Sequence, residues 1–270
     1  MSKAKNDITK VASGIYDEVI AVLGNHKAPD EIREDINALF EETYGVNTAR
    51  RTRLASLTWA EIDKIAKGDN PAQYLRVGDE KVIELITGEK LTAVILGFDH
   101  DILIENGELS HNNAGITFGI KEIMDGWFEM NADDTNVGGW ETSKMRTVYM
   151  ERIFKLLPPD VQAVIKLVGK PTGIGDGENE IRFTEDKLFL LSEMEIRGEN
   201  SYTADGEGMQ YEYFKNGGSL IKERDGAAYG WWLRSPNTTS STNFISVVSS
   251  GSVRYGSASG AFGVSFGFCV

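Results

Sequence analysis

The segment from Trp231 to Val270, "WWLRSPNTTSSTNFISVVSSGSVRYGSASGAFGVSFGFCV", decides how the whole sequence is interpreted. Its two ends are apolar and aromatic, whereas its middle consists mainly of Ser, Thr, Gly and Asn. Arg254 is the only charged side chain between Asn237 and Val270, although charged residues make up 26% of the chain. A segment so different from its surroundings needs its own structural or functional explanation.

Runs of β-prone residues alternate with turn residues through this segment. Strands are indicated at Trp231–Ser235, at Asn243–Val248 and, after the turn-forming "SSGS", at 253–255. The apolar "GVSFGFCV" from Gly263 predicts a last strand that pairs inside the body of the protein. We therefore expect an apolar scaffold on both sides of a hydroxyl-rich surface, which we call the C-terminal window (residues 237–262).

Two plainer interpretations of the C-terminal window compete with a functional one. A flexible Ser/Gly linker would not carry bulky residues such as Phe244, Ile245 and Tyr255. Ordinary hairpin surface normally carries Lys and Glu, which protect strand edges and keep the protein in solution, and neither residue occurs here. Antibody loops favour Ser, Gly, Asn and Tyr because these residues combine adaptable hydrogen bonds with rigid contact area. The composition therefore favours a binding surface.

The composition of the 270-residue chain limits the class of protein. A net charge of −13 argues against nucleic acid or an anionic membrane as a partner, since both would repel the chain. Cys269 is the single cysteine, so no intrachain disulfide can form. No apolar run is long enough to span a bilayer, and the N-terminus leads into an amphipathic segment. We therefore expect synthesis in the cytoplasm without a signal peptide.

The remaining chain predicts an α+β fold. Helical spacing over 8–22 and 30–44 indicates a helical extension, and a capping box at Thr58–Glu61 starts a further helix. The later elements are expected in this order: a hairpin at 81–85 and 91–98, a strand at 114–120, helices over 143–169 with a break at Pro158-Pro159, and a buried strand at 186–196. Helices come first, then mixed elements, then short strands, which is an α+β order.

The sequence makes no positive case for catalysis. Asp99-His100-Asp101 resembles a fragment of a metal site, but no second group of ligands accompanies it, and a turn-stabilising role is favoured. Asp133-Asp134 lacks the spacing of an EF-hand. Cys269, between Phe268 and Val270, is expected to be a buried thiol. We predict that the protein is not an enzyme and binds no cofactor or metal, and an enzyme with a site between residues 99 and 140 is the weakest alternative.

The residue types of the C-terminal window follow a genetic rule. Every residue from Asn237 to Phe262 is Asn, Thr, Ser, Phe, Ile, Val, Gly, Arg, Tyr or Ala. Each of these can be reached from an asparagine codon, AAC or AAT, by changing only its adenines. Lys, Glu, Gln, Met and Trp cannot be reached in this way, and all of them are absent. Asp, His, Cys, Leu and Pro could be reached but are also absent, so the window is compatible with the rule without proving it.

The chain resembles a known family in several blocks that occur in order. They are "WWLRSP" at 231–236, the spaced Phe244, Val247, Gly251 and Ala258, the terminal "GVSFGFCV", and upstream "VGDEKVIEL" at 77–85, "ILGFDHD" at 95–101, "AGITF" at 114–118, "NVGGWETSKMR" at 136–146 and "DKLFLLSEMEI" at 186–196. The C-terminal blocks resemble the variable proteins of diversity-generating retroelements, whose surface codons are rewritten by adenine-directed mutagenic reverse transcription. The upstream blocks resemble a broader uncharacterised family of bacterial and phage proteins.

This resemblance implies a C-type-lectin-like domain over residues 58–270, with a helical extension over 1–57 and a variable region at about 237–262. The calcium-ligand motifs of sugar-binding lectins are missing, so the resemblance does not imply calcium-dependent carbohydrate binding. A lone Cys269 also cannot supply the cysteine pair of the related formylglycine-generating enzymes.

The resemblance and the composition together imply non-enzymatic binding of a protein or cell-surface ligand. The chain would act on a phage virion or a cell surface, in receptor binding or display, and residues 1–57 would attach it to a virion or mediate self-association. The alternative is a structural virion or surface protein whose Ser-rich end packs against a neighbouring subunit. Phe244, Val247 and Ala258 are expected to be scaffold. The expected ligand contacts are Asn237, Thr238, Thr239, Asn243, Ile245, Ser246, Val248, Ser249, Arg254, Tyr255, Gly256, Ser257, Ser259, Gly260, Ala261 and Phe262.

Overall fold

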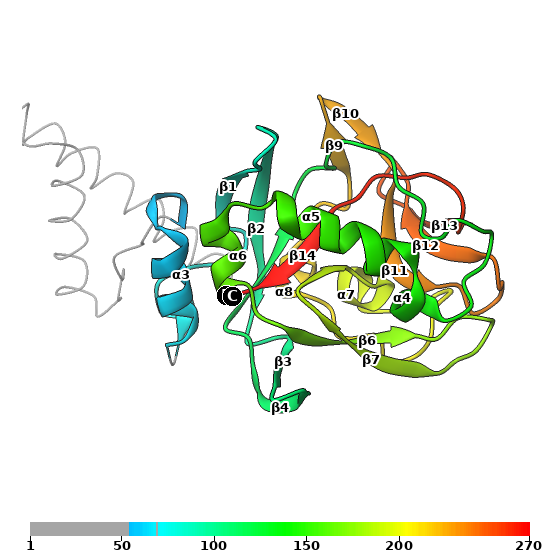
Figure 1. Cartoon of the computed structure of the whole chain (residues 1–270), viewed down its shortest axis with the longest axis horizontal. Coiled ribbons are helices and arrows are strands. Elements are labelled where there is room, and N and C mark those ends of the chain that lie inside the picture. The colour runs from blue at the N-terminus through cyan, green and yellow to red at the C-terminus, as the bar shows by residue number, and fades with distance from the viewer. Residues whose placement is uncertain (1–53, 69) are drawn as a thin grey trace, which may run out of the picture. The chain divides into compact units, whose positions relative to one another are not determined.

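The computed structural model describes residues 54–68 and 70–270, which belong to one compact unit (Figure 1). The helical extension expected over residues 1–57 lies outside the described residues, apart from its last positions. There the 3₁₀ turn η2 (Leu54–Ser56) leads toward the first described helix.

Helix α3 (Trp59–Ala66) begins where the sequence predicts. The Thr58 hydroxyl accepts a hydrogen bond from the Glu61 N–H at 3.3 Å, and the Glu61 carboxylate accepts one from the Thr58 N–H at 2.7 Å. Trp59 is buried on the inner face of this helix. Its end lies so close to Gly115 that a Cβ there would come within 1.9 Å of the Ala66 carbonyl oxygen, so this position requires glycine.

A five-stranded antiparallel sheet has the order β1-β2-β5-β14-β8. Its strands are β1 (Glu80–Glu84), β2 (Lys90–Phe98), β5 (Ile116–Ile120), β14 (Phe266–Cys269) and β8 (Leu188–Leu190). The predicted hairpin and the predicted last strand are confirmed. Strand β14, red in Figure 1, places Gly267 between Gly119 of β5 and Phe189 of β8. The last strand therefore lies inside the sheet, and Cys269 is buried there as expected.

A second antiparallel sheet has the order β4-β3-β6-β7. Its strands are β3 (Ile102–Glu105), β4 (Glu108–Asn113), β6 (Val168–Gly173) and β7 (Ile181–Asp186). The short helical elements are η3 (Pro71–Gln73), α4 (Gly139–Thr142), the π-helical η4 (Met145–Met150), α5 (Glu151–Leu156) and α6 (Pro159–Val164). Helices thus fill most of the predicted span 143–169, with the break at Pro158. Val168 and Gly169 instead begin β6, because an apolar Val/Ile run fits either a helix or a strand.

A third sheet, β11-β12-β13, carries the C-terminal window. Its strands are β11 (Trp231–Pro236), β12 (Asn243–Val247) and β13 (Val253–Ser257), and the hairpin β9 (Lys222–Arg224) and β10 (Ala227–Tyr229) precedes them. All three strands lie where the sequence predicts. The described residues combine antiparallel sheets with short helices, which confirms the α+β class.

The continuous strand predicted over 186–196 is wrong in its second half. After β8, the chain turns into the short helix α7 (Glu193–Arg197). Ser192 and Glu195 form a capping box in which each accepts the other's backbone N–H, at 3.0 and 3.1 Å. The same signature at Thr58 predicted α3 correctly, but the apolar run before Ser192 concealed this one. A further short helix, α8 (Glu212–Lys215), follows it.

A fully buried ion pair joins β11 to α7. Arg234 has no exposed surface, and its guanidinium donates to both carboxylate oxygens of Glu195, at 2.5 and 2.9 Å. The other guanidinium hydrogens go to the carbonyls of Pro171, Leu190 and Glu207. Burial alone would raise the pKa of Glu195, but Arg234 and Lys170 lower it below its usual value. The carboxylate is therefore charged and fully paired.

Lys170 extends this ion pair into the first two sheets. Its ammonium lies 2.6 Å from Glu195 and also donates to Asp101, although it is itself fully buried in β6. The Tyr211 hydroxyl donates to Asp101 at 2.9 Å, as does Thr117 of β5 at 2.6 Å. Burial would raise the pKa of Asp101, but the Lys170 ammonium holds it well below its usual range. Asp101 is thus a structural carboxylate within a buried network.

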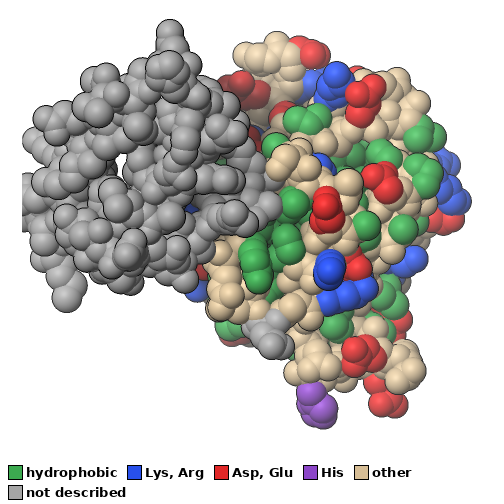
Figure 2. Space-filling view, turned by 90° about the vertical axis from the view of Figure 1, so that its left-hand side faces the viewer, with side chains coloured by type: hydrophobic (Ala, Val, Ile, Leu, Met, Phe, Trp, Pro, Cys, Tyr) green, Lys and Arg blue, Asp and Glu red, His purple; other side chains and the backbone are tan. Residues whose placement is uncertain are grey.

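Charged side chains of both signs are interspersed over the face that Figure 2 shows. The C-terminal window, with Arg254 as its single charged residue, is therefore not typical of this protein's surface. Within the described part of the chain, no helix has both the length and the apolar character needed to cross a membrane.

Replacing the buried arginine tests the importance of the network. Arg234→Met should lower the free energy of unfolding by about 3–5 kcal/mol, because it leaves Glu195 buried beside fewer cations. Chemical denaturation measures this change. The matched control is Arg254→Met, which removes an exposed arginine from strand β13 of the same sheet and should change stability by less than ~0.5 kcal/mol. Equal effects of the two substitutions would contradict the structural role of the network.

Candidate functional site

The C-terminal window forms strands β12 and β13 and the turns on either side of them. β12 is the middle strand, with Trp231 opposite Val247 on one side and Tyr255 opposite Ile245 on the other. Figure 1 shows these orange strands at the right of the view. The turn from Asn237 to Asn243 leads from β11 into β12, and residues 258–262 lead out of β13. The window therefore belongs to a three-stranded platform and its connecting turns.

Asn136 holds the turn at 237–243 through main-chain atoms. Its side-chain amide is fully buried and donates to the carbonyls of Asn237, Ser240 and Asn243, at 3.1, 2.7 and 2.8 Å. Its own N–H donates to the Ser241 carbonyl at 2.7 Å. All of these acceptors belong to the peptide backbone. The hold that Asn136 has on the turn thus does not depend on which side chains the turn carries.

Other parts of the window are held in the same way. The Thr238 N–H donates to the Tyr202 carbonyl, and the Ala258 N–H donates to the Thr242 carbonyl, each at 2.8 Å. Phe128 and Phe262 exchange backbone hydrogen bonds at 3.0 and 3.1 Å. The framework therefore contacts the window mainly through peptide groups, which every residue except proline provides.

The three side chains of the window that the sequence predicts as scaffold lie in the core. Phe244, Val247 and Ala258 are all fully buried. Phe262 packs on Trp232 with ring centroids 4.5 Å apart, so it is only partly exposed. These contacts attach the window to the hydrophobic core of the domain.

The expectation of surface contact is wrong for Asn237, Ile245 and Ser246, whose exposures are 1%, 0% and 0%. Asn237 is buried because its side chain caps the turn, accepting from the Thr239 N–H and hydroxyl, each at 2.7 Å. Ile245 and Ser246 are adjacent in β12, so their side chains point to opposite faces, and both are buried because packing covers both faces of the strand.

The other expected contacts are accessible to different degrees. Thr239, Ser249, Arg254, Tyr255, Ser259 and Ala261 are exposed, and Thr238, Asn243, Val248, Gly256, Ser257, Gly260 and Phe262 are partly exposed. Tyr255 is the largest of them, half exposed, with its ring edge-to-face against Tyr202 at 5.6 Å. Whether these residues bind a ligand remains a prediction.

Sequence reasoning missed the residues around the window that support it. Asn136 lies in "NVGGWETSKMR", a block that carries the family resemblance but whose pattern does not reveal a hydrogen-bonding role. Tyr202 and Asp134, which accepts a hydrogen bond from Ser257, come from distant loops. The run of glycines after Asn136 was the available signal, because Gly138 and Gly139 both have positive φ.

The Asp99-His100-Asp101 group has a structural role. Asp101 belongs to the buried network, and His100 stacks on Tyr211 with ring centroids 4.1 Å apart. The His100 Nε2 lies 3.1 Å from the Met209 carbonyl. In residues 54–68 and 70–270, no group of three or more His, Cys, Asp or Glu side chains could hold a metal ion. These contacts favour the turn-stabilising interpretation of the group.

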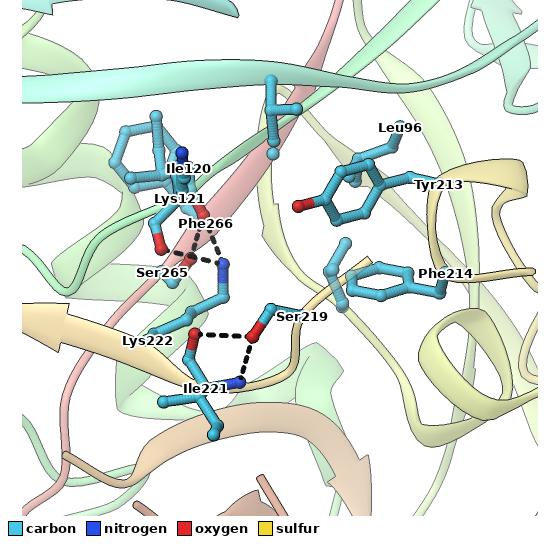
Figure 3. Close-up of a pocket in the computed structure, with 13 residues that line it drawn as sticks. Leu96, Ile120, Lys121, Tyr213, Phe214, Ser219, Ile221, Lys222, Ser265 and Phe266 are labelled. Carbon is cyan, nitrogen blue, oxygen red and sulfur yellow. Dashed lines mark hydrogen bonds between the residues drawn. The ribbon is translucent and has the colours of Figure 1, made fainter. Parts of the chain in front are cut away.

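A small cavity lies between α8 and the strands around it (Figure 3). Its volume is about 50 Å³, which admits a few water molecules, whereas ligand pockets typically exceed about 300 Å³. Lys222 lies at its wall and donates to the Ile120 carbonyl. Burial lowers the pKa of Lys222 to about 7. The cavity is too small to be a substrate site of ordinary size.

Glu207 is a buried acid next to the start of the window. Its Oε1 accepts from the Gly173 N–H at 2.6 Å, whereas its buried Oε2 has no hydrogen-bond partner. Burial raises its pKa to about 7, although Arg234 acts in the opposite direction. Because the folded protein holds this proton more tightly than the unfolded chain, the stability that Glu207 contributes at low pH is lost as pH rises from about 4.5 through about 7.

The stability of the Glu207→Gln variant should depend less on pH. Between pH 5 and 8 the wild type should lose about 2–3 kcal/mol that the variant does not, since the neutral amide has no proton to release. Denaturation at the two pH values, compared between the proteins, measures this difference. Glu178→Gln, which changes an exposed glutamate, is the control and should follow the wild type. Parallel pH profiles for wild type and Glu207→Gln would refute the raised pKa.

Removing the Asn136 amide tests how the window is held. Asn136→Leu keeps the size of the side chain but removes the donor to three carbonyls, of which, within the described chain, only that of Asn243 keeps a hydrogen bond, from the Asn237 N–H, so unfolding should become easier by about 2–4 kcal/mol. Thermal unfolding measures this cost. The double substitution Thr239→Tyr with Ser259→Tyr, at exposed positions of the window, should shift stability by less than ~0.5 kcal/mol for each site. The opposite order of effects would show that side chains of the window, and not its backbone, hold it in place.

Comparison with known proteins identifies the family of the chain. The model of a family described as a domain of unknown function, DUF6273, matches residues 115–270. No curated protein and no solved structure matches. The match begins just before β5 and includes the whole β11-β12-β13 platform and Asn136, whereas the blocks at 77–85 and 95–101 precede it. Because the match spans more than half of the 270 residues, the chain belongs to the DUF6273 family.

Proposed function

We propose that the protein binds a protein or cell-surface ligand through the C-terminal window, without enzymatic activity, and that a diversity-generating retroelement varies the window. The observation that carries the proposal is the main-chain anchoring of the window. Asn136, Tyr202 and Phe128 all hold it through backbone groups, so its exposed side chains can be exchanged at little cost in stability. A surface that must vary needs this kind of support.

The exposed positions also have suitable chemistry for binding. Thr239, Ser249 and Ser259 present small hydroxyl-bearing side chains, and Tyr255 adds a large, rigid ring. Their residue types all lie within the set reachable from AAC or AAT through adenine changes. Exposed positions on the three-stranded platform thus carry residue types that the codon rule allows. This agreement supports diversification more strongly than composition alone.

The proposed fold is C-type-lectin-like, which the α+β arrangement accommodates. Support for it comes from the ordered sequence blocks and from the position of β14, which returns the chain to the central sheet after the window. The proposed place of action is a phage virion or a cell surface, in receptor binding or display. Residues 1–57 would provide attachment or self-association.

The gene sequence tests diversification without knowledge of the ligand. A codon that began as AAC or AAT keeps C or T as its third base, so each varied position should end in a pyrimidine. Serine should be AGY or TCY and never TCA or TCG, and Arg254 should be CGY and not AGA or AGG. Sequencing the codons for Ser249, Arg254, Ser257 and Ser259 decides the matter. Purine third bases at several of them would exclude adenine-directed mutagenesis.

The neighbouring DNA provides a second readout of the same proposal. A reverse transcriptase gene and a near-copy of the codons for the C-terminal window should lie close to this gene. Differences between the two copies should be confined to adenines of the near-copy. If both are missing and purine third bases occur, the Ser-rich composition requires the structural alternative, in which the window packs against a neighbouring subunit.

A further inference from the structure

Strand β13 has an open hydrogen-bonding edge. Within the described residues it pairs with β12 and with no other strand. At the two ends of the β12–β13 pairing, the Val248 N–H donates to the Ser252 carbonyl, and the Ala258 N–H donates to the Thr242 carbonyl. Hydrogen-bonded and non-hydrogen-bonded pairs alternate along antiparallel strands, so the hydrogen-bonded pairs between these ends are Ser246 with Arg254 and Phe244 with Gly256. It follows that the N–H and C=O of Tyr255 point away from β12.

Few protective features cover this edge. Edge strands are commonly protected by Lys, Pro or a bulge, and β13 contains none of these. Its one charged residue, Arg254, folds its guanidinium back onto the carbonyl of Val253 at 2.8 Å. The Ser257 carbonyl is taken by the Gly260 N–H at 2.8 Å. The open groups are therefore the N–H of Val253 and Ser257 and both backbone groups of Tyr255.

Carboxylates lie near the Ser257 end of β13 and near the turn at 237–243. Asp134 accepts a hydrogen bond from the Ser257 hydroxyl at the end of β13. The Asp176 N–H donates to the side-chain oxygen of Asn136. The next residue, Gly177, lies beside the Thr238 carbonyl, and the exposed Glu178 follows it in sequence. Within the described part of the chain, Asp134, Asp176 and Glu178 form no salt bridge. The local charge therefore favours a cationic partner and disfavours a second copy of this acidic chain.

An aromatic pair lies beside the same edge. Tyr255 is 51% exposed, and its ring meets Tyr202 edge-to-face. Exposed aromatic faces attract lysine and arginine side chains, and this attraction adds to that of the carboxylates. The open backbone groups of β13 thus favour an extended peptide as the partner, and the carboxylates and aromatic rings favour Lys or Arg side chains on it.

We propose that β13 takes up an extended, Lys- or Arg-bearing peptide segment of the partner as an added strand. The inference rests on the proposed binding function and specifies the class of its ligand. Backbone hydrogen bonds to Tyr255 would hold the segment whatever the side chains of the window are, and those side chains would select among partners. Binding can then persist while specificity changes.

Titration with designed peptides tests this proposal. The probes are a short peptide of alternating Lys and Val, its counterpart with Glu in place of Lys, and the Lys peptide N-methylated at alternate residues. The Lys peptide should bind the full-length protein, whereas the Glu peptide should bind at least about tenfold more weakly. N-methylation, which blocks strand pairing but keeps the charge, should also abolish most of the binding. This comparison does not depend on any protein variant.

Two sets of variants locate the binding. Tyr255→Pro removes the outward N–H without breaking a bond to β12, and it should weaken the Lys peptide about tenfold. Asp134→Asn with Asp176→Asn and Glu178→Gln should do the same. The control, Glu84→Gln with Glu108→Gln and Glu151→Gln, removes equal charge at exposed positions of other elements and should have little effect.

Several results would overturn the inference. For the peptides, these are binding of the N-methylated Lys peptide as tight as that of the unmethylated one, or no binding of the Lys peptide at all. For the variants, they are a loss of binding in the charge control as large as that in the Asp134, Asp176 and Glu178 variant, or a wild-type dimer that Tyr255→Pro dissociates. The last result would make a second copy the occupant. None of these outcomes bears on the codon test, so a failure of strand addition can be distinguished from a failure of diversification.

Discussion

The buried ion pair between Arg234 and Glu195 is the constraint on which the β11-β12-β13 platform depends. It fixes the inner side of β11 to α7, and Lys170 connects the same carboxylate to Asp101 near the central sheet. Such a network is costly to bury, so it persists only where every charge has a partner. Every described element that reaches it is therefore held in one relative position. The C-terminal window begins just beyond Arg234 and starts from that fixed point.

Beyond Arg234, different residues hold the backbone of the window and present side chains to solvent. Asn136 and the neighbouring loops hold the backbone of the window, so its exposed side chains contribute few of the contacts that fix its path. Asn237, which caps its own turn, is the exception that shows the limit of this separation. A side chain that shapes the backbone cannot be exchanged freely, even though its codon belongs to the reachable set. We expect the freedom of the surface to be greatest at Thr239, Ser259 and Tyr255.

The sequence predicted elements whose signals are local, and it failed where distant residues decide. Thr58 and Glu61 lie within one turn, so the start of α3 could be read directly, and the strands of the platform followed from β-prone runs between turns. The helix α7 was missed because an apolar run conceals its capping box at Ser192. The burial of Ile245 and Ser246 follows from packing that covers both faces of β12, which no local pattern records. The role of Asn136 depends on carbonyls about a hundred residues away along the chain.

Strand β14 follows the C-terminal window in sequence and lies between β5 and β8 in the central sheet. During synthesis this sheet cannot close until the whole window has left the ribosome. A frameshift or premature stop within the window removes β14, so the truncated product lacks an inner strand and is open to proteolysis. Folding thus acts as a proofreading step for a gene diversified as proposed, and only chains with an intact reading frame reach their partner. Adenine changes in AAC or AAT codons also cannot create a stop codon, because every stop codon ends in a purine.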